Sequence, residues 1–454
     1  MIVSFSVENF RSFDGEETFS LIASNRTTGH ENHTIPIPGS DERLLRAAVV
    51  YGANGAGKSN LFKAINYLDN MALNPRGKNA GTGREPFKFG ENQDKPSSFD
   101  LCFIAGQKVY RFGFKLDDHR IIEEWLVRVE GKREKELYER TTDPNGKVVI
   151  EAKGLKSAGE KLKALATVGG PPNQTFLATI RATLGQSDYG DELTAIVGWF
   201  EINLQLLRPD TPYLPLSDRL AKDPEFLKFA GDFLKSSSTG VDHLKVIKKE
   251  LTEEQLRGFL PEEIISEVIK SMQEDGLAVM RLREGKEILV ERSGENHYYL
   301  VTIQAAHEHS AGRVIPLELS EESDGTQRLL NLIPALHHLR TSGGVFVIDE
   351  IDRSMHPMLT WKFLEFFLKS CEGEQRQVIV TTHESNLLDL DLLRRDEIWF
   401  AEKDKLGATR LYSMADFQVR KDLEIRKHYL QGRFGAVPFL GSLDRLLMEG
   451  EAHT

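Results

Sequence analysis

The sequence predicts an α/β fold: a mixed sheet with flanking helices, an antiparallel β part and a mainly helical insertion. Three stretches lead to this prediction. The apolar run 47–51 is followed by the glycine-rich loop Gly52–Ser59 and then by an amphipathic helix. The runs Val345–Ile348 and Val378–Thr381 are also apolar and rich in β-branched residues. Uniformly apolar strands are typical of a parallel sheet that is buried on both faces.

The loop Gly52–Ser59 reads GANGAGKS, which has the spacing of a phosphate-binding loop. Its glycines let backbone N–H groups surround phosphate oxygens, and the helix N-terminus behind them favours negative charge. We expect Lys58 to reach the β- and γ-phosphates of a nucleotide and the Ser59 hydroxyl to ligate Mg²⁺. The predicted nucleotide-binding residues of this stretch are Asn54, Gly55, Gly57, Lys58, Ser59 and Asn60.

Two carboxylates, Asp349 and Glu350, end the apolar run Val345–Ile348. The carboxyl ends of parallel strands are where ligands bind in such sheets. We therefore expect Asp349, together with Ser59, to hold the Mg²⁺ and its water shell, and Glu350 to act as base on an attacking water. His383 follows the run ending at Thr382 in the same way. It is predicted to reach the γ-phosphate and to respond to its loss, which makes Glu350 and His383 the candidate catalytic residues.

Composition places the chain among globular proteins with a large core, because 40% of its 454 residues are hydrophobic and 28% are charged. A net charge of −11 gives no overall basic character that would point to nucleic acid. The two cysteines, Cys102 and Cys371, are far apart and exclude a disulfide scaffold. No apolar run approaches the roughly 18 residues of a membrane span. We therefore expect a cytoplasmic protein without a membrane partner.

Three segments describe the expected organisation. Residues 1–150 would form the first half of the nucleotide-binding part with a β-meander, 151–310 a mainly helical insertion, and 311–454 the second half with a helical tail. Residues 25–44 and 74–97 are expected to be loops. The expected strands are 1–10, 17–22, 47–51, 99–104, 109–114, 121–129, 147–151, 279–282, 287–290, 298–303, 314–319, 345–348, 378–381, 398–401 and 409–413. The expected helices are 60–72, 159–167, 193–200, 224–235, 242–249, 261–273, 323–341 and 357–370.

With its phosphate loop, acidic strand end and strand-end histidine in this order, the chain resembles the ABC-type ATPase heads of the SMC, RecF and OLD group. The resemblance implies a Mg-dependent ATPase that converts ATP and water to ADP and phosphate. The stretch 319–328, LSEESDGTQR, is similar to the signature loop of these heads. Ser323 and Gly325 would then contact the γ-phosphate bound to a partner subunit. Asp324 departs from the glycine that is commoner at its position.

Other parts of the resemblance concern contacts around the nucleotide. Asp352, two residues after the acidic pair, is expected at a subunit interface. Arg11 lies in the stretch NFRSF, where the arginine of related heads approaches the nucleotide. Two interpretations of Arg11 are open, a nucleotide contact and a solvated surface residue. The glutamine of a glutamine-bearing loop would be Gln93 or Gln107.

Within this group, the stretches DEIDRSMHP, ESDGTQRL and YLQGRFGAVP are similar to stand-alone bacterial phage-defence ATPases. That subset includes the ATPase subunit of PARIS, RloA and AbiL-type proteins, which typically act with a separately encoded nuclease or toxin. The resemblance implies an ATP-hydrolysing sensor or scaffold of an abortive-infection system. It would form a homo-oligomer, a head-to-head dimer or larger, hold an effector, and be triggered by a phage protein or DNA.

Two other functions compete with this hypothesis. A RecF-like repair ATPase would bind DNA through basic residues on one groove. The basic clusters at 153–163, 245–249 and 420–433 are modest, however, and such charge runs are usually solvated faces. An OLD-type ATPase-nuclease would need a further domain with its own acidic cluster after His383. The carboxylates there, Asp389, Asp391 and Asp396, do not form one in the sequence.

Overall fold

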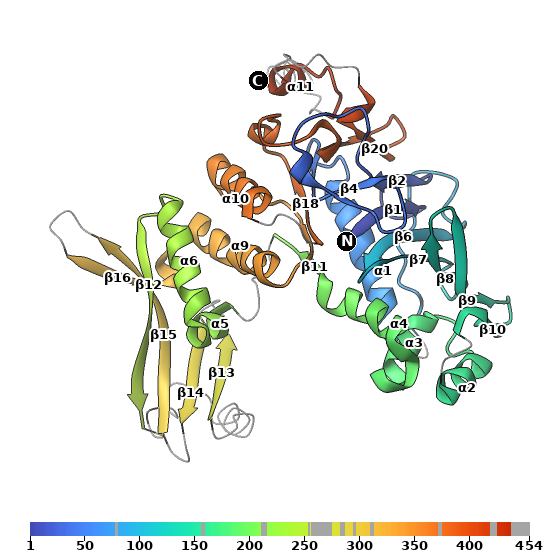
Figure 1. Cartoon of the computed structure of the whole chain (residues 1–454), viewed down its shortest axis with the longest axis horizontal. Coiled ribbons are helices and arrows are strands. Elements are labelled where there is room, and N and C mark those ends of the chain that lie inside the picture. Colours follow the sequence, from blue (N-terminus) through green and yellow to red (C-terminus); the bar gives the residue numbers. More distant parts are fainter. Residues whose placement is uncertain are drawn as a thin grey trace, which may run out of the picture. The chain divides into compact units, whose positions relative to one another are not determined.

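The computed structural model describes residues 1–77, 80–155, 159–209, 216–252, 255, 275–281, 287–293, 297–308, 313–370, 375–417 and 425–436. The expected helix at 261–273 and Cys371 lie outside these residues. The chain divides into two compact units (Figure 1). The first contains Met1–Leu206, Gly343–Ile351 and the described part of Cys371–Thr454. The second contains Leu207–Ser342 and Asp352–Ser370.

The six-stranded sheet of the first unit carries the candidate site. Its strand order is β11-β17-β18-β5-β19-β20, and β17, β18, β5 and β19 run parallel. Strands β5, β17 and β18 are buried along their whole length, as their apolar composition predicts. The bounds are Ala47–Tyr51 for β5, Leu204–Leu207 for β11, Gly344–Ile348 for β17, Arg376–Thr382 for β18, Ile398–Lys403 for β19 and Thr409–Ser413 for β20.

Helix α1, Lys58–Leu73, follows the phosphate loop and packs between two sheets of the first unit. One flank contacts β18 of the six-stranded sheet. On the other flank, the ring of Tyr67 lies 5.0 Å from the ring of Phe99, measured between centroids. Both flanks belong to one continuous hydrophobic core. This packing fixes the N-terminus of α1, and with it the phosphate loop, relative to the strand ends.

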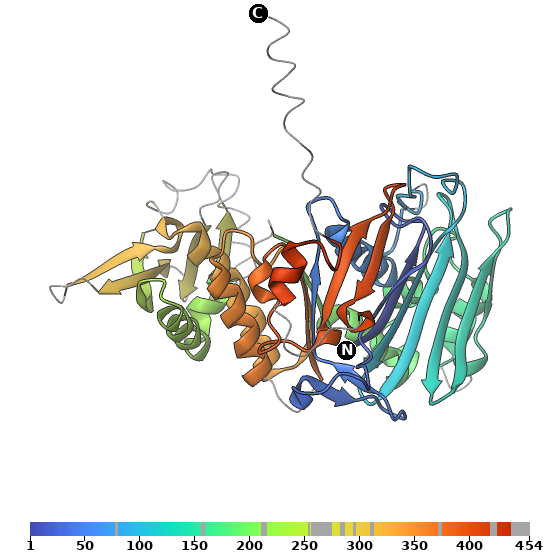
Figure 2. The same ribbon diagram turned by 90° about the horizontal axis from the view of Figure 1, so that it is seen from above.

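The second sheet of the first unit has seven antiparallel strands in the order β10-β9-β8-β7-β6-β1-β2, seen as one layer in Figure 2. The β-meander that the sequence predicts is confirmed, but β9 was not among the expected strands. The bounds are Ile2–Glu8 for β1, Glu17–Ser20 for β2, Ser97–Ala105 for β6, Lys108–Leu116 for β7, Ile121–Glu130 for β8, Arg133–Thr142 for β9 and Val148–Glu151 for β10.

Smaller elements complete the first unit. The expected loop 25–44 contains a short hairpin formed by β3, Thr34–Pro36, and β4, Arg43–Leu45. Three helices cover part of the seven-stranded sheet, and a fourth lies near the end of the described chain. They are α2, Glu160–Val168, α3, Phe176–Thr183, α4, Gln186–Gly198, and α11, Ile425–Leu430. Buried Glu124 of β8 accepts hydrogen bonds from the backbone N–H groups of Phe176 and Leu177, which caps α3 against the sheet.

The second unit combines an antiparallel sheet with helices. The sheet order is β12-β15-β14-β13, and β16 also pairs with β15. The strands are β12, Val241–Leu251, β13, Asp275–Arg281, β14, Glu287–Ser293, β15, His297–Glu308, and β16, Val314–Glu318. The described helices are α5, Leu216–Lys222, α6, Pro224–Ser236, α9, Asp324–Thr341, and α10, Pro357–Ser370. The unit is therefore α/β in its described part, and not mainly helical.

Two further expectations differ from the observed organisation. The predicted helix at 242–249 is wrong, because these residues form β12 and pair with β15 from Val241 to Leu251. The compact units also differ from the expected segments. Residues 151–206 group with the first unit, whereas α9 and α10 group with the second. The α/β fold that the sequence predicts for the nucleotide-binding part is confirmed.

Asp69 of α1 allows the cost of ionising a carboxyl group in the core to be measured. Burial raises the pKa of Asp69 to about 7, and its Oδ1 has no hydrogen-bond partner in the described structure. Because the folded pKa lies above the unfolded one, ionisation of Asp69 opposes folding increasingly as the pH rises from about 4 to about 7. We predict that Asp69→Asn raises the free energy of unfolding near pH 8 by up to about 4 kcal/mol, and by less near pH 5.

Urea unfolding of the full chain at both pH values measures this effect. Asp191→Asn is a matched control, because Asp191 is exposed on α4. An equal shift in both variants, or a gain for Asp69→Asn that does not change with pH, would contradict the proposed cost of ionising Asp69.

Candidate active site

The phosphate loop needs its glycines at two positions for steric reasons. Gly57 adopts φ 111° at the N-terminus of α1, a left-handed conformation that residues with a Cβ rarely adopt. A Cβ on Gly57 would overlap the Oγ1 of Thr409, and a Cβ on Gly52 would overlap the carbonyl oxygen of Ala401. The loop is therefore packed closely against β19 and β20. Its shape is set by the fold around it.

Lys58 is buried at the base of this loop, with 4% of its surface exposed. Its Nζ donates hydrogen bonds to the carbonyl oxygens of Gly52, at 2.6 Å, and Ala53, at 3.1 Å. The same nitrogen lies 3.1 Å from Nδ1 of His383. The ammonium group is thus held inside the curve of the loop, where it can neutralise phosphate charge. The structure brings the predicted phosphate lysine and the predicted strand-end histidine into contact.

The carboxylate of Asp349 joins three elements at the carboxyl edge of the parallel sheet. Its Oδ1 accepts a hydrogen bond from Ser59 Oγ of α1 at 3.2 Å, and one from Thr381 Oγ1 of β18 at 2.6 Å. Asp349 itself follows β17 and is buried, with 5% exposed. A hydroxyl and a carboxylate form the oxygen donor set that Mg²⁺ prefers, so Ser59 and Asp349 fit their predicted role as metal ligands.

Glu350 has a strained backbone conformation that its neighbours impose. Its φ of 48° is left-handed, and its N–H donates to Thr381 Oγ1 at 2.9 Å. The next N–H, of Ile351, donates to the carbonyl oxygen of Thr381 at 3.1 Å. Left-handed glutamate is uncommon and occurs where surrounding contacts over-determine it, frequently at functional sites. The side chain is partly exposed, and its Oε1 lies 3.9 Å from Nε2 of His383.

Thr381 is a functional candidate that the sequence reasoning did not identify. Its hydroxyl contacts both Asp349 and the backbone of Glu350, so it positions the predicted metal ligand and the predicted base together. The available signal was its place, two residues before His383 at the end of a buried strand. An apolar residue would be expected at this buried strand end. The hydroxyl of a buried threonine there needs a hydrogen-bond partner.

The N-terminal turn that contains Arg11 is attached to the phosphate loop. Ser12 Oγ accepts a hydrogen bond from Asn60 Nδ2 and lies 2.8 Å from Oγ1 of Thr409. Thr409 Oγ1 in turn donates to the carbonyl oxygen of Ala56 at 2.9 Å. Arg11 pairs with Glu85. The structure thus places Arg11 on a turn beside the start of α1, while its contact with nucleotide stays a prediction.

The predicted signature residues occupy the second unit. Ser323 is exposed and caps α9, with its Oγ accepting a hydrogen bond from the N–H of Thr326. Gly325 packs against the turn after the acidic pair, because a Cβ there would lie 2.9 Å from the carbonyl oxygen of Ser354. Asp352 begins that turn, and its carbonyl oxygen accepts from the N–H of Met355. Ser323, Gly325 and Asp352 therefore belong to adjoining loops of one unit.

The two glutamine candidates occupy loops of the first unit. Gln93 donates a hydrogen bond to the carbonyl oxygen of Lys88, and the carbonyl oxygen of Gln93 accepts one from Arg84. Gln107 lies in the turn between β6 and β7. Within the described residues, the hydrogen bonds of Gln93 are made within its own loop, and the structure does not decide between Gln93 and Gln107 as the glutamine contact.

The fold and the site define a class, the α/β P-loop ATPase heads. Residues 47–157 and 180–389 match the family described as "AAA domain, putative AbiEii toxin, Type IV TA system". Because this match spans most of the chain, the chain belongs to that AAA domain family. The matched segments include the phosphate loop, the acidic pair and His383. No curated protein matches the chain.

Solved structures of SMC heads are similar at low identity. A head bound to the C-winged helix domain of ScpA has 13% identity and a TM-score of 0.42, covering 91% of this chain and 97% of that one. The head domain from Thermotoga maritima has 13% identity and a TM-score of 0.36, covering 92% and 99%. The Pyrococcus furiosus head, bound to the C-terminal domain of ScpA, has 12% identity and a TM-score of 0.34, covering 91% and 96%. Each helix in the described part of the chain is too short or too polar to cross a bilayer.

Replacement of Thr381 tests the geometry of the acidic pair. Valine keeps the shape of threonine but removes the hydroxyl that holds Asp349 and Glu350, so Thr381→Val should lower the rate of ATP hydrolysis by about 10- to 100-fold and raise the Mg²⁺ requirement. Thr381→Ser, which restores the hydroxyl, should recover most of the activity. Steady-state hydrolysis across a Mg²⁺ titration measures both effects. A valine variant with wild-type rate and Mg²⁺ dependence would exclude a positioning role for Thr381.

Proposed function

We propose that the protein is a Mg-dependent ATPase that works as the sensor or scaffold subunit of an anti-phage abortive-infection system. The main support for ATPase activity is that five side chains of the predicted types lie together at one edge of the parallel sheet. They are Lys58, Ser59, Asp349, Glu350 and His383. These residues come from separate elements of one compact unit, and their types match the parts that phosphoryl transfer to water requires.

Each of these side chains has a distinct part in the proposed reaction. The loop amides and Lys58 bind and orient the phosphates of ATP. Bound Mg²⁺, held by Ser59 and Asp349, would neutralise charge on the phosphate oxygens. Glu350 takes the proton of the attacking water, which its partial exposure allows. His383 lies between Lys58 and Glu350 and reports the loss of the γ-phosphate to the chain that follows it.

The site is proposed to close between two subunits. Exposed Ser323 at the N-terminus of α9 offers a hydroxyl and backbone amides, which are suited to a phosphate oxygen of a neighbouring head. The adjoining turn at Asp352 would lie at the same interface. ATP binding would therefore favour a homo-oligomer, and hydrolysis would release it.

The defence role rests on three supports. The family description names a putative AbiEii toxin and a Type IV TA system. The sequence resembles phage-defence ATPases that act with a separate effector nuclease or toxin. The second unit also has its own sheet, which offers a surface apart from the phosphate loop for an effector, or for a phage protein or DNA as trigger.

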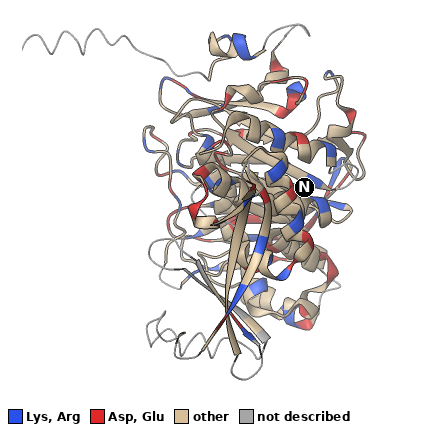
Figure 3. Ribbon diagram, turned by 90° about the vertical axis from the view of Figure 1, so that its left-hand side faces the viewer, with Lys and Arg blue, Asp and Glu red and all other residues tan. Residues whose placement is uncertain are grey.

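A DNA-clamping repair ATPase is the alternative function. It is less favoured because the chain has a net charge of −11, and Figure 3 shows Lys and Arg interspersed with Asp and Glu along the described elements. Co-purification with a product of a neighbouring gene would support the sensor role. Salt-dependent binding of duplex DNA without such a partner would support the clamp.

Two substitutions separate nucleotide binding from hydrolysis. Glu350→Gln removes the base but leaves the phosphate loop intact, so it should retain ATP, lower hydrolysis by about 100-fold or more, and stabilise the oligomer. Lys58→Ala should abolish ATP binding, and with it the stabilisation of the oligomer by ATP. Equilibrium binding of labelled ATP and light scattering measure these outcomes. Wild-type hydrolysis by Glu350→Gln would refute the assignment of the base.

A mixing experiment tests closure in trans. Lys58→Ala and Ser323→Arg should each be inactive alone, because every site of either homodimer lacks one part. Mixed in equal amounts, they form hybrid dimers with one complete site, which should restore about a quarter of the wild-type rate. Light scattering checks that the mixed variants assemble. If they assemble but hydrolyse ATP no faster than either variant alone, Ser323 lies outside a shared site.

A further inference from the structure

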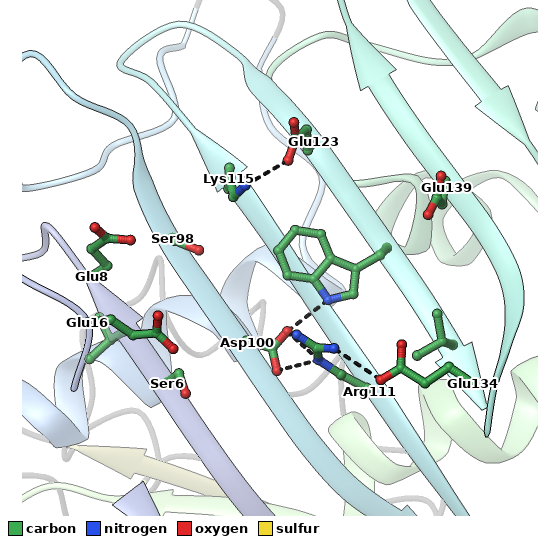
Figure 4. Close-up of a pocket in the computed structure, with 13 residues that line it drawn as sticks. Ser6, Glu8, Glu16, Ser98, Asp100, Arg111, Lys115, Glu123, Glu134 and Glu139 are labelled. Carbon is green, nitrogen blue, oxygen red and sulfur yellow. Dashed lines mark hydrogen bonds and ion pairs between the residues drawn. The ribbon is translucent and has the colours of Figure 1, made fainter. Parts of the chain in front are cut away.

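The outer face of the seven-stranded sheet is hollowed, as the close-up in Figure 4 shows. The hollow has a volume of about 530 Å³ and spans β1, β6, β7, β8 and β9. The opposite face of the same strands packs on the core around α1. The hollow therefore lies on a face that the first unit does not use for its own packing or for the candidate active site.

Small residues in the strand register create this hollow. Ser6 of β1 lies opposite Asp100 of β6, Asp100 lies opposite Gly113 of β7, and Gly113 lies opposite Trp125 of β8. A Cβ on Gly113 would overlap the indole ring of Trp125. Glycine at 113 thus lets the indole lie flat across the neighbouring strand, which leaves one ring face directed away from the sheet.

The orientation of Trp125 is fixed by polar contacts. Its Nε1 donates a hydrogen bond to Oδ2 of Asp100 at 2.8 Å. The same carboxylate accepts from Nε of Arg111 at 2.8 and 2.9 Å. Arg111 also reaches Glu134 at 3.1 Å. A large aromatic ring held in one orientation on a sheet surface loses little entropy on binding, so it is a suitable contact for a partner.

The charges around Trp125 are unbalanced. The hollow is lined by carboxylates of six residues and by two cations, Arg111 and Lys115. Both cations are already paired within it, Arg111 as described and Lys115 with Glu123 at 3.0 Å. The three other carboxylates, Glu8, Glu16 and Glu139, form no ion pair with any residue that the structure describes. Glu139 lies opposite Trp125 in the strand register, and Glu8 and Glu16 lie at the β1 side of the hollow, so its lining has an excess of negative charge.

We infer that this hollow, defined by Trp125 with Glu8, Glu16 and Glu139, is a docking surface for an arginine- or lysine-bearing segment of a partner protein. A guanidinium or ammonium group can lie over the indole face beside Glu139, which lies opposite Trp125, while Glu8 and Glu16 at the β1 side of the hollow can receive a second cation of the same segment. The strand register spaces these contacts over several strands, which suits an extended peptide carrying more than one cation. The inference does not depend on ATP hydrolysis or on a defence role.

Peptide binding to the full chain tests this inference. The probe is a fluorescein-labelled octapeptide of alternating arginine and serine, with a glutamate–serine octapeptide as its counterpart, followed by fluorescence anisotropy. The wild-type chain should bind the arginine peptide and not the glutamate peptide. Glu139→Lys should weaken binding by about tenfold, because it reverses a free charge within the hollow.

Glu42→Lys is the matched control, since Glu42 is exposed in the first unit, outside the hollow, and the substitution makes the same change in net charge. It should alter the affinity by less than about twofold. Trp125→Phe keeps an aromatic ring but loses the hydrogen bond to Asp100, and should weaken binding by an intermediate factor. Unchanged ATP binding and thermal unfolding show that each variant is folded.

Three outcomes would overturn the inference. The first is absence of binding of the arginine peptide to the wild-type chain. The second is an equal loss of affinity in Glu139→Lys and Glu42→Lys, which would indicate attraction to the overall negative charge. The third is displacement of the peptide by Mg²⁺ or spermidine when the competitor supplies the same total positive charge as the peptide. That result would indicate a site for small cations.

Discussion

The buried carboxylate of Asp349 is the interaction on which the candidate site depends. A carboxylate that is almost fully removed from water is stable only when hydrogen-bond donors satisfy it. Here the donors are the hydroxyls of Ser59 and Thr381, which belong to α1 and β18. The three elements that carry the phosphate loop, the proposed metal ligands and the strand-end histidine are thereby connected. Because Thr381 also holds the backbone of Glu350, a shift of Asp349 would also move Glu350, the proposed base.

Much of this arrangement could be predicted from the sequence because the central strands are buried on both faces. Such strands need uninterrupted apolar residues, and the runs at 47–51, 345–348 and 378–381 meet that need. Strands of this kind are parallel, so polar residues that follow them meet at one edge. The glycine spacing of the phosphate loop has a steric origin, because Thr409 approaches Gly57 too closely to leave room for a Cβ.

Other features depend on partners distant in the sequence and could not be predicted in the same way. Strand β9 is largely charged, and it pairs with β8 although its own residues show little alternation. The spacing in β12 suits a helix, yet pairing with β15 determines its structure. The sequence shows Thr381 as a polar residue at a strand end, but its role depends on the contact with Asp349, which the structure provides. Likewise, nothing in the composition of α9 and α10 distinguishes the second unit from the first.

The order of strands in the six-stranded sheet has a consequence for how the protein is made. Strand β5 lies between β18 and β19, and both follow the whole second unit in the chain. During synthesis, the phosphate loop and its apolar strand emerge from the ribosome long before the strands that cover their edges. Until β18 and β19 are synthesised, the nascent chain therefore has an apolar strand with unpaired edges, a state prone to aggregation. Lys58, Asp349 and His383 can come together only after the residues up to His383 have been translated.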